Sequence, residues 1–210
     1  MKENTFELKS LIKKADEVII KIEVNVLEER IKMAISFFKL FIQNNKSIVF
    51  LIDGGFHNEA LAIHRLSIEH FFNIFALIRN KDYLDKIRTQ SSVDLEKAMK
   101  SIHVDLEKDN YKNIEKNKSD AFIEAVKASY ESPIESLGHN IYNAAKSSEV
   151  GNFYNSVYRI LSLKYAHSTY LIAIDGCNNK DINSCISNAS DFLRITIALF
   201  HEKFPELNSK

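Results

Sequence analysis

A predicted helix over residues 58–80 carries the side chains whose types and spacing could do chemistry. At about 100° per residue, apolar side chains cover most of its circumference, so the helix belongs inside the protein. The narrow polar stripe that remains consists of Asn58, Ala62, Arg65, Glu69 and Asn73. Arg65 and Glu69 lie one turn apart and can pair, which predicts an internal ion pair that fixes helix register. The alternative is a polar cleft in which Arg65 binds a phosphate or carboxylate and Glu69 orients it.

A second polar stripe is predicted on a helix over residues 153–174, where small and polar residues recur at helical spacing. Its members are Asn155, Tyr158, Arg159, Ser162, Ala166 and Thr169. Small side chains let a neighbouring helix approach closely, and we expect that neighbour to be the helix over 58–80. Tyr158 and Ser162 would then bond to Arg65 or Glu69.

Four residues separate Arg65 from His70, a spacing that resembles the catalytic motif of the HEPN superfamily of all-helical nucleases and nucleotide-binding proteins. In its ribonuclease members the arginine stabilises the phosphate and the histidine serves acid–base chemistry, usually across a dimer. The resemblance implies these roles for Arg65 and His70, although Leu66 stands where active members often have a polar residue. On an ideal helix Arg65 and His70 point about 140° apart, so one active centre needs a distorted turn or a partner chain. His167 is the other candidate base: its apolar face is typical of a core histidine, but its titration near neutral pH leaves catalysis open.

A second resemblance covers more of the chain, from about residue 30 to residue 175. The residues that carry it are Glu59, Ala60, Arg65, Glu69, Tyr158, Ser162 and His167. They are similar to a bacterial all-helical family of unknown function, distantly HEPN-like, with an R-x-x-x-E motif on one helix and a Y-x-x-L-S…H motif on a later one. This resemblance implies a helical fold and brings no established activity with it.

The composition predicts an all-α protein, because five Gly and two Pro in 210 residues leave long periodic runs. We expect one domain over residues 1–210, a HEPN-like bundle of about five to seven helices, with a charged helical excursion at about 81–120. Gly54 and Gly55 should end the helix before residue 58, and Asn44-Asn45 could break it earlier. The remaining helices are expected at 6–14, at 16–52, from a capped start at 132–135, and at 185–204.

Several function classes are disfavoured by what the sequence lacks. With 28 basic and 28 acidic residues, bulk charge alone would not hold the chain to nucleic acid. There is no His-Glu-x-x-His motif, carboxylate-rich helix pair or Gly-rich phosphate loop, so no metal or cofactor is predicted. The first residues lack the apolar core of a signal peptide and no apolar run reaches about 18 residues. We therefore expect a cytoplasmic protein that does not enter a membrane.

The first functional hypothesis is a HEPN-like bacterial protein, a metal-independent ribonuclease toxin or phage-defence component, in which Arg65 holds a phosphate and a histidine moves the proton. Enclosure of a fully paired Arg65 within its own chain would contradict it. The alternatives are a non-catalytic dimeric helical interaction module and a small anion or nucleotide sensor. A homodimer is predicted, with RNA or a nucleotide as further partners, because one modest bundle seems short of room for every phenylalanine. Part of the following set is expected to form the dimer face: Phe37, Phe38, Phe41, Phe71, Phe72 and Phe75.

Overall fold

The computed structural model describes residues 4–23, 27–165, 173–174 and 176–208. These residues contain eight α-helices and no strand, which confirms the all-α prediction. This number of helices exceeds the expected five to seven because it includes two short helices, α6 of 6 residues and α7 of 7 residues. The helices are α1 (Asn4–Lys21), α2 (Glu29–Asp53), α3 (His57–Arg79), α4 (Tyr83–Lys108), α5 (Lys116–Glu131), α6 (Ile141–Lys146), α7 (Arg159–Tyr165) and α9 (Asn179–Lys203).

The chain divides into two compact units, one of residues 1–81 with 141–210 and the other of residues 82–140. The second unit contains most of the charged segment expected at about 81–120. Every described residue of the candidate site belongs to the first unit. The expectation of one domain over the whole chain stays a prediction.

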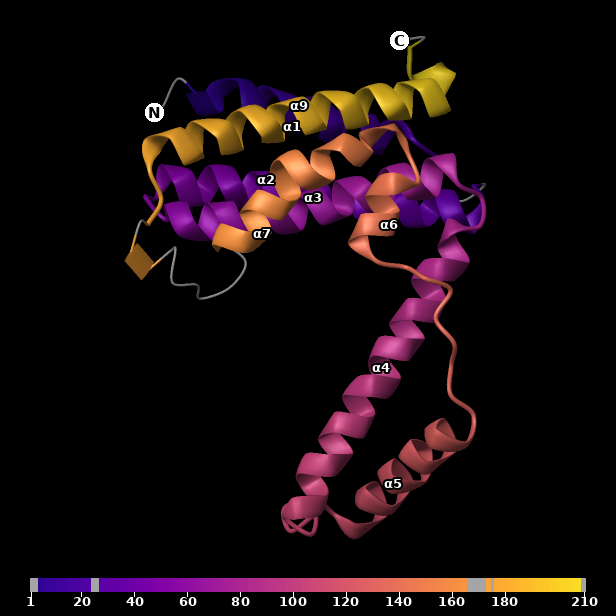
Figure 1. Cartoon of the computed structure of the whole chain (residues 1–210). Coiled ribbons are helices and arrows are strands. Elements are labelled where there is room, and N and C mark those ends of the chain that lie inside the picture. The colour runs from indigo at the N-terminus through magenta and orange to yellow at the C-terminus, as the bar shows by residue number, and fades with distance from the viewer. Residues whose placement is uncertain (1–3, 24–26, 166–172, 175, 209–210) are drawn as a thin grey trace. The chain divides into compact units, whose positions relative to one another are not determined.

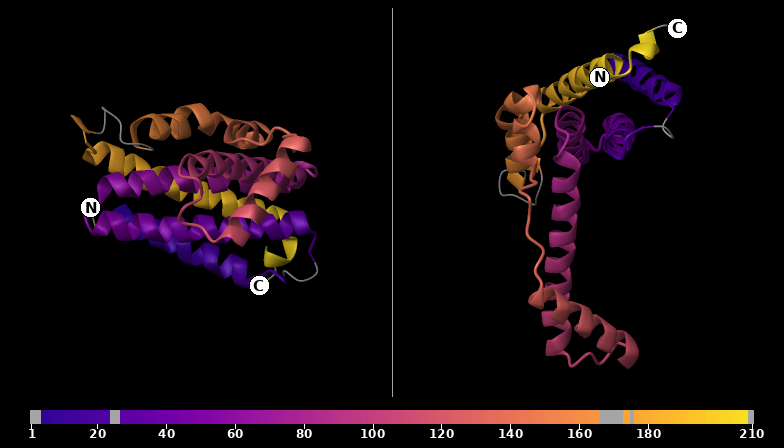
Figure 2. Two further views of the ribbon diagram at one scale, coloured as in Figure 1. Left: turned by 90° about the horizontal axis from the view of Figure 1, so that it is seen from below. Right: turned by 90° about the vertical axis from the view of Figure 1, so that its right-hand side faces the viewer.

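α3 is the central helix of the first unit, where it contacts α2, α6, α7 and α9. α2 and α3 lie side by side and antiparallel (Figures 1 and 2). Gly54 caps α2, and Gly55 has a φ of +83°, the left-handed conformation that glycine adopts without strain. The reversal predicted at this pair of glycines is therefore confirmed, and so is the helix expected over 58–80.

Most phenylalanines expected at a dimer face lie in the core instead. Five have exposures of 1% or less: Phe38, Phe41, Phe71, Phe72 and Phe75. α9 provides the packing partners that allow these rings to be buried within one chain. Its Phe192 stacks on Phe71 with ring centroids 4.7 Å apart, and its Phe200 stacks on Phe38 at 4.5 Å. These five are therefore core residues of the chain. Of the set, only Phe37 keeps part of its surface exposed, and the dimer stays a prediction.

The helix expected over residues 16–52 is two helices. α1 ends at Lys21 and α2 begins at Glu29. The sequence between them is rich in β-branched residues, which lose side-chain freedom in a helix. The interruption allows α1 to pack against both α2 and α9, so tertiary burial outweighs helix continuity.

The break expected at Asn44-Asn45 is absent, because Asn45 is built into the core of α2. Its Nδ2 donates to the carbonyl of Phe41 at 2.8 Å and to Ser67 Oγ on α3 at 3.2 Å. The Asn45 side chain thus bonds to a carbonyl one turn earlier in α2 and to a side chain of α3. In this position it does not replace the backbone hydrogen bonds of α2.

The second unit is a hairpin of α4 and α5 (Figure 1). The capped helix start expected at 132–135 is wrong: α5 ends at Glu131, and residues 133–140 are not helical. Two contacts with α4 hold this segment extended. The Ile134 N–H donates to Glu96 Oε2 at 3.1 Å, and Ser136 Oγ donates to Gln90 Oε1 at 2.7 Å. The local capping pattern is thus overridden by tertiary hydrogen bonds.

The helix expected over residues 153–174 has an irregular start. A π-helical turn, η3 (Tyr154–Tyr158), precedes α7, and residues 166–172 lie outside the described residues. α9 begins six residues earlier than expected, because Asn178 and Asp181 form a reciprocal capping box. α9 ends at Lys203, before Pro205, as predicted.

By length and composition α3 could cross a membrane, although 67% of its most apolar window is buried inside the protein. Its apolar surface is taken up by the neighbouring helices of the first unit. α3 is therefore a core helix of the first unit.

Candidate functional site

The polar stripe of α3 meets the start of α7. Arg65 and Glu69 are half-buried, with side-chain exposures of 25% and 20%. Across from them, Tyr158 ends the π-helical turn η3 and is 7% exposed, while Ser162 lies one turn further on in α7. We call these four residues the Arg65 cluster. Their proximity confirms the expected contact between the two predicted stripes.

Hydrogen bonds connect all four members of the Arg65 cluster. Arg65 Nε donates to Ser162 Oγ at 2.8 Å, and Arg65 Nη2 donates to Tyr158 Oη at 2.8 Å. Arg65 Nη1 pairs with Glu69 Oε1 at 2.9 Å, and Tyr158 Oη donates to that same oxygen at 2.8 Å. The guanidinium carbon also lies 5.0 Å from the centre of the Tyr158 ring, which adds a cation–π contact. Each guanidinium nitrogen therefore has a partner in the same chain.

The π-helical turn brings Tyr158 into this network. A π turn inserts one extra residue per turn, which changes the direction of the side chains that follow it. The pKa of Tyr158 is raised to about 12, chiefly by burial and also by the hydrogen bond and negative charge of Glu69, against opposing effects of Ser162 and Arg65. The phenol stays protonated at neutral pH and can donate its proton to Glu69. Periodicity in the sequence gave no sign of this turn.

His70 is not among the hydrogen-bond partners of Arg65. Its ring contacts Phe37 of α2, with centroids 5.7 Å apart, and burial lowers its pKa below the usual value. The sequence expectation that Arg65 and His70 face different directions agrees with this placement. Among the described residues, Arg65 and His70 thus contact different partners: Arg65 bonds to Glu69, Tyr158 and Ser162, and His70 packs against Phe37.

The other predicted site residues lie outside the Arg65 cluster or outside the described residues. Arg159 is exposed at the start of α7. Asn73 is buried at 6% exposure, and its Oδ1 has no hydrogen-bond partner among the described residues. His167 lies in the segment that is not described, so its predicted role stays a prediction. Of the described residues, neither Arg159 nor Asn73 joins the hydrogen bonds of Arg65.

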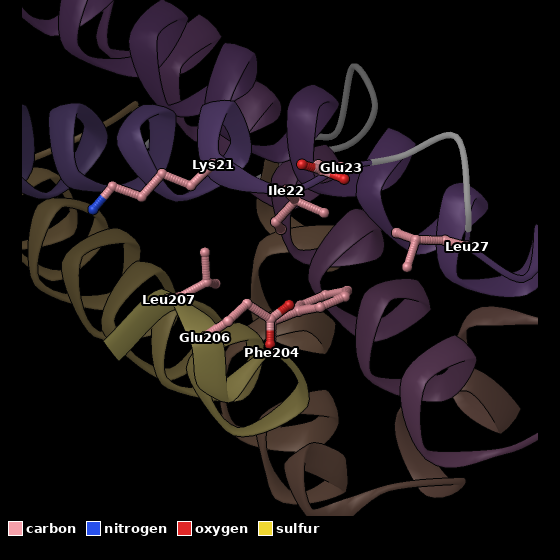
Figure 3. A pocket seen from close by; sticks show the side chains of 7 residues that line it. All are labelled: Lys21, Ile22, Glu23, Leu27, Phe204, Glu206 and Leu207. Atoms are coloured by element: carbon pink, nitrogen blue, oxygen red, sulfur yellow. The ribbon is translucent and has the colours of Figure 1, made fainter. Parts of the chain in front are cut away.

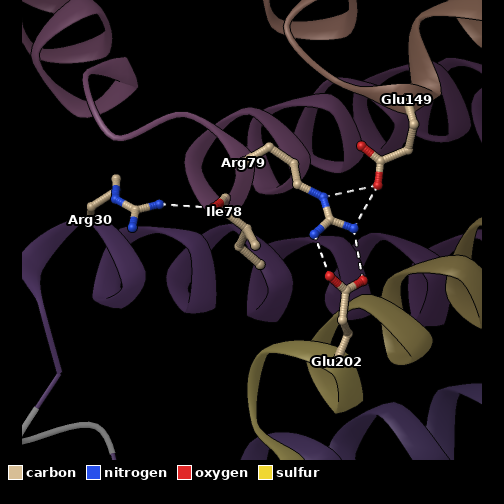
Figure 4. A network of polar contacts seen from close by, with 5 residues as sticks. All are labelled: Arg30, Ile78, Arg79, Glu149 and Glu202. Carbon is tan, nitrogen blue, oxygen red and sulfur yellow. Dashed lines mark hydrogen bonds and ion pairs between the residues drawn. The ribbon is translucent and has the colours of Figure 1, made fainter.

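Sequence reasoning missed two arginines at the C-terminal end of α3 (Figure 4). Arg30, on α2, is 8% exposed and donates to the carbonyls of Leu77 and Ile78, which have no partner within the helix end. Arg79 donates to Glu149 at 2.7 Å and to both carboxylate oxygens of Glu202 at 2.5 and 2.8 Å. Its partners lie 70 and 123 residues away, so no local pattern could have identified them. The bonds of Arg79 hold together the end of α3, the segment at Glu149 and the end of α9. We call Arg79, Glu149 and Glu202 the clamp.

We expect Arg79→Met to lower the free energy of unfolding by only about 0.5–1 kcal/mol, because all three side chains of the clamp are a third or more exposed. The loss should shrink as salt screens the charges. Urea unfolding at low and high ionic strength measures it. A loss above about 2 kcal/mol that is independent of salt would contradict a surface ion-pair network.

A pocket of about 400 Å³ lies between the C-terminal end of α1 and the C-terminal segment of the chain (Figure 3). Its lining residues are Lys21, Ile22, Glu23, Leu27, Phe204, Glu206 and Leu207. None of them is a predicted site residue. Among the residues that the structure describes, no group of three or more His, Cys, Asp or Glu side chains could hold a metal ion.

Fold and site define an all-helical protein whose central helix carries a paired, half-buried arginine. A protein-family model described as "Family of unknown function (DUF5677)" matches residues 30–182. The match covers most of the chain, and the protein belongs to this family. Its extent is close to residues 30–175, over which the sequence resembled a helical family of unknown function. No curated protein and no solved structure gave a significant match.

Proposed function

We propose that this chain is a non-catalytic helical binding module, in which the Arg65 cluster is an internal brace that holds α7 on α3. The observation that carries the proposal is the pairing of every guanidinium nitrogen of Arg65 within its own chain. An arginine that binds phosphate directs its planar fork of N–H groups at the ligand. Here that fork is directed at Glu69, Tyr158 and Ser162.

The position of His70 supports the same proposal. A general acid or base must come within about 2.6–3.2 Å of the proton that it moves, directly or through one water. His70 packs against Phe37 and is not among the hydrogen-bond partners of Arg65, and burial lowers its pKa. The proposal is supported because Arg65 is engaged by its own chain and the His70 ring contacts an aromatic side chain of α2.

The second candidate function is a HEPN-like, metal-independent ribonuclease of bacterial defence. One observation favours it: the Arg65 side chain is still 25% exposed and has N–H groups beyond the three that are paired. A phosphate could reach these groups, and a second copy of the chain could contribute the histidine. This function requires a homodimer with RNA as substrate.

RNA cleavage by the purified full chain distinguishes the two functions. We expect no cleavage above background by the wild-type protein with chelator present. His70→Gln and Arg65→Lys variants are assayed in parallel, with circular dichroism to verify folding. Cleavage by wild type that both folded variants lose would refute the binding-module proposal and establish the ribonuclease.

A further inference from the structure

A second pocket, of about 390 Å³, lies between α3, the segment that contains α7, and α9, all within the first unit. Apolar lining residues such as Leu61, Ile160 and Leu161 come from α3 and α7, and α9 contributes polar ones such as Ser184 and Asn188. A concave volume of this size, lined by both apolar and polar side chains, is within the range of sites for small organic molecules.

His64 forms part of the pocket wall and is the unusual residue in it. The side chain is 1% exposed, and neither ring nitrogen has a hydrogen-bond partner among the described residues. The ring stacks on Phe192, with centroids 6.2 Å apart and planes 19° from parallel. Buried polar groups in folded proteins nearly always have partners, because an unpaired one retains its full desolvation penalty. A partner from outside the chain would remove this penalty.

The pocket favours an uncharged partner. Burial lowers the pKa of His64 to about 4, so the imidazole is neutral at pH 7 and offers one donor and one acceptor. Lys164 Nζ and Asp181 Oδ2 pair at 3.1 Å, and Tyr165 Oη donates to that carboxylate oxygen at 2.8 Å. These opposite charges balance, so a charged ligand would lose its hydration without gaining a counter-charge.

We propose that this pocket binds a small uncharged molecule with an amide-type head group. An amide carries both a C=O and an N–H, so it can pair with the one ring nitrogen of His64 that turns toward the pocket, whether that nitrogen donates or accepts. Ser184 and Asn188 provide further polar contacts. The apolar body of the ligand lies against Leu61 and Ile160. The inference rests on the proposed binding function, for which it names a ligand class. No member of the Arg65 cluster lines the pocket, so the two sites can be tested separately.

Three probes with the same aromatic body and different charge test this site: phenylacetamide, phenylacetate and phenethylamine. Each is titrated at pH 7 into the full chain with ¹⁵N-labelled histidine, and the imidazole resonances are followed by nuclear magnetic resonance. His64→Leu identifies the His64 signals by their loss. We expect phenylacetamide to shift them with a Kd of about 1–10 mM, which is ordinary for a fragment of this size, and the charged probes to bind at least about tenfold more weakly.

Two exposed positions on α9 provide a matched pair of variants. Ser184→Trp fills the pocket from its rim and should abolish the shift, whereas Ala198→Trp, at an exposed position that does not line the pocket, should leave it unchanged. Equal binding of all three probes, shifts that persist in Ser184→Trp, or His64 signals that no probe moves would each overturn the proposal. RNA cleavage by the wild-type chain would instead refute the binding module and leave the pocket result standing.

Discussion

Arg65→Met should lower the free energy of unfolding by about 2–3 kcal/mol. Methionine retains the apolar stem but leaves the Glu69 carboxylate and the Tyr158 hydroxyl without their cationic partner. Removing one member of a fully buried pair costs about 3–5 kcal/mol, and the 25% and 20% exposures of this pair reduce the effect. Urea unfolding followed by circular dichroism at pH 7 measures the change.

Arg159→Met is the matched control, since Arg159 follows Tyr158 in the chain but is exposed. It should change stability by less than about 0.5 kcal/mol, as surface substitutions usually do. Arg65→Lys keeps the charge but loses the planar fork, and we expect a loss between these two values. If Arg65→Met were as stable as wild type, the cluster would not be a brace, and its arginine would be held for a ligand.

Acid should destabilise the wild-type protein through His64, and His64→Leu should remove that part of the pH dependence. The folded-state pKa of His64 is about 4, below its usual 6.5, because burial disfavours the charged imidazolium. Above pH 6.5 the ring is neutral in both states and contributes no pH dependence. Between pH 6.5 and about pH 4 the unfolded chain binds a proton that the folded chain does not, so stability falls as the pH falls. At pH 5 this loss is about 2 kcal/mol.

The measurement compares urea unfolding of wild type and His64→Leu at pH 7 and pH 5. Carboxylates and the other histidines titrate in both proteins, so their effects cancel in the difference. At pH 7 the variant should be as stable as wild type or more so, because leucine has no unpaired ring nitrogens. Equal pH dependence in the two proteins would mean that the folded and unfolded chains bind a proton at His64 equally well, which would contradict the lowered pKa of the buried ring.

The patterns that depend on a single helix were readable from the sequence. Arg65 and Glu69 stand one turn apart on an otherwise apolar helix, and Tyr158 and Ser162 share a stripe on another. Helical periodicity fixes which side chains share a face, and a charged stripe on a buried helix has to find polar partners. The pairing of these two stripes could therefore be predicted before any coordinates were known.

Patterns that compete with tertiary contacts were misread. The sequence at 132–135 has the local features of a helix start, but Glu96 on α4 accepts from the Ile134 backbone and keeps the segment extended. The interruption between α1 and α2 was missed because the apolar spacing continues through it. Local propensities differ by less than about 1 kcal/mol per residue, so a few long-range contacts decide between them.

The sequence by itself determined the helical class, the central helix, the reversal at Gly54-Gly55 and the two polar stripes, because each follows from local periodicity or local backbone freedom. Only the tertiary structure decided that each guanidinium nitrogen of Arg65 has a partner, that His70 contacts Phe37, and that neither ring nitrogen of His64 has a partner among the described residues. Those facts depend on which helices meet and on the π turn before α7. The bonds of Arg65 to Tyr158 and Ser162 join residues 93 and 97 positions apart, and no periodicity within one helix encodes them.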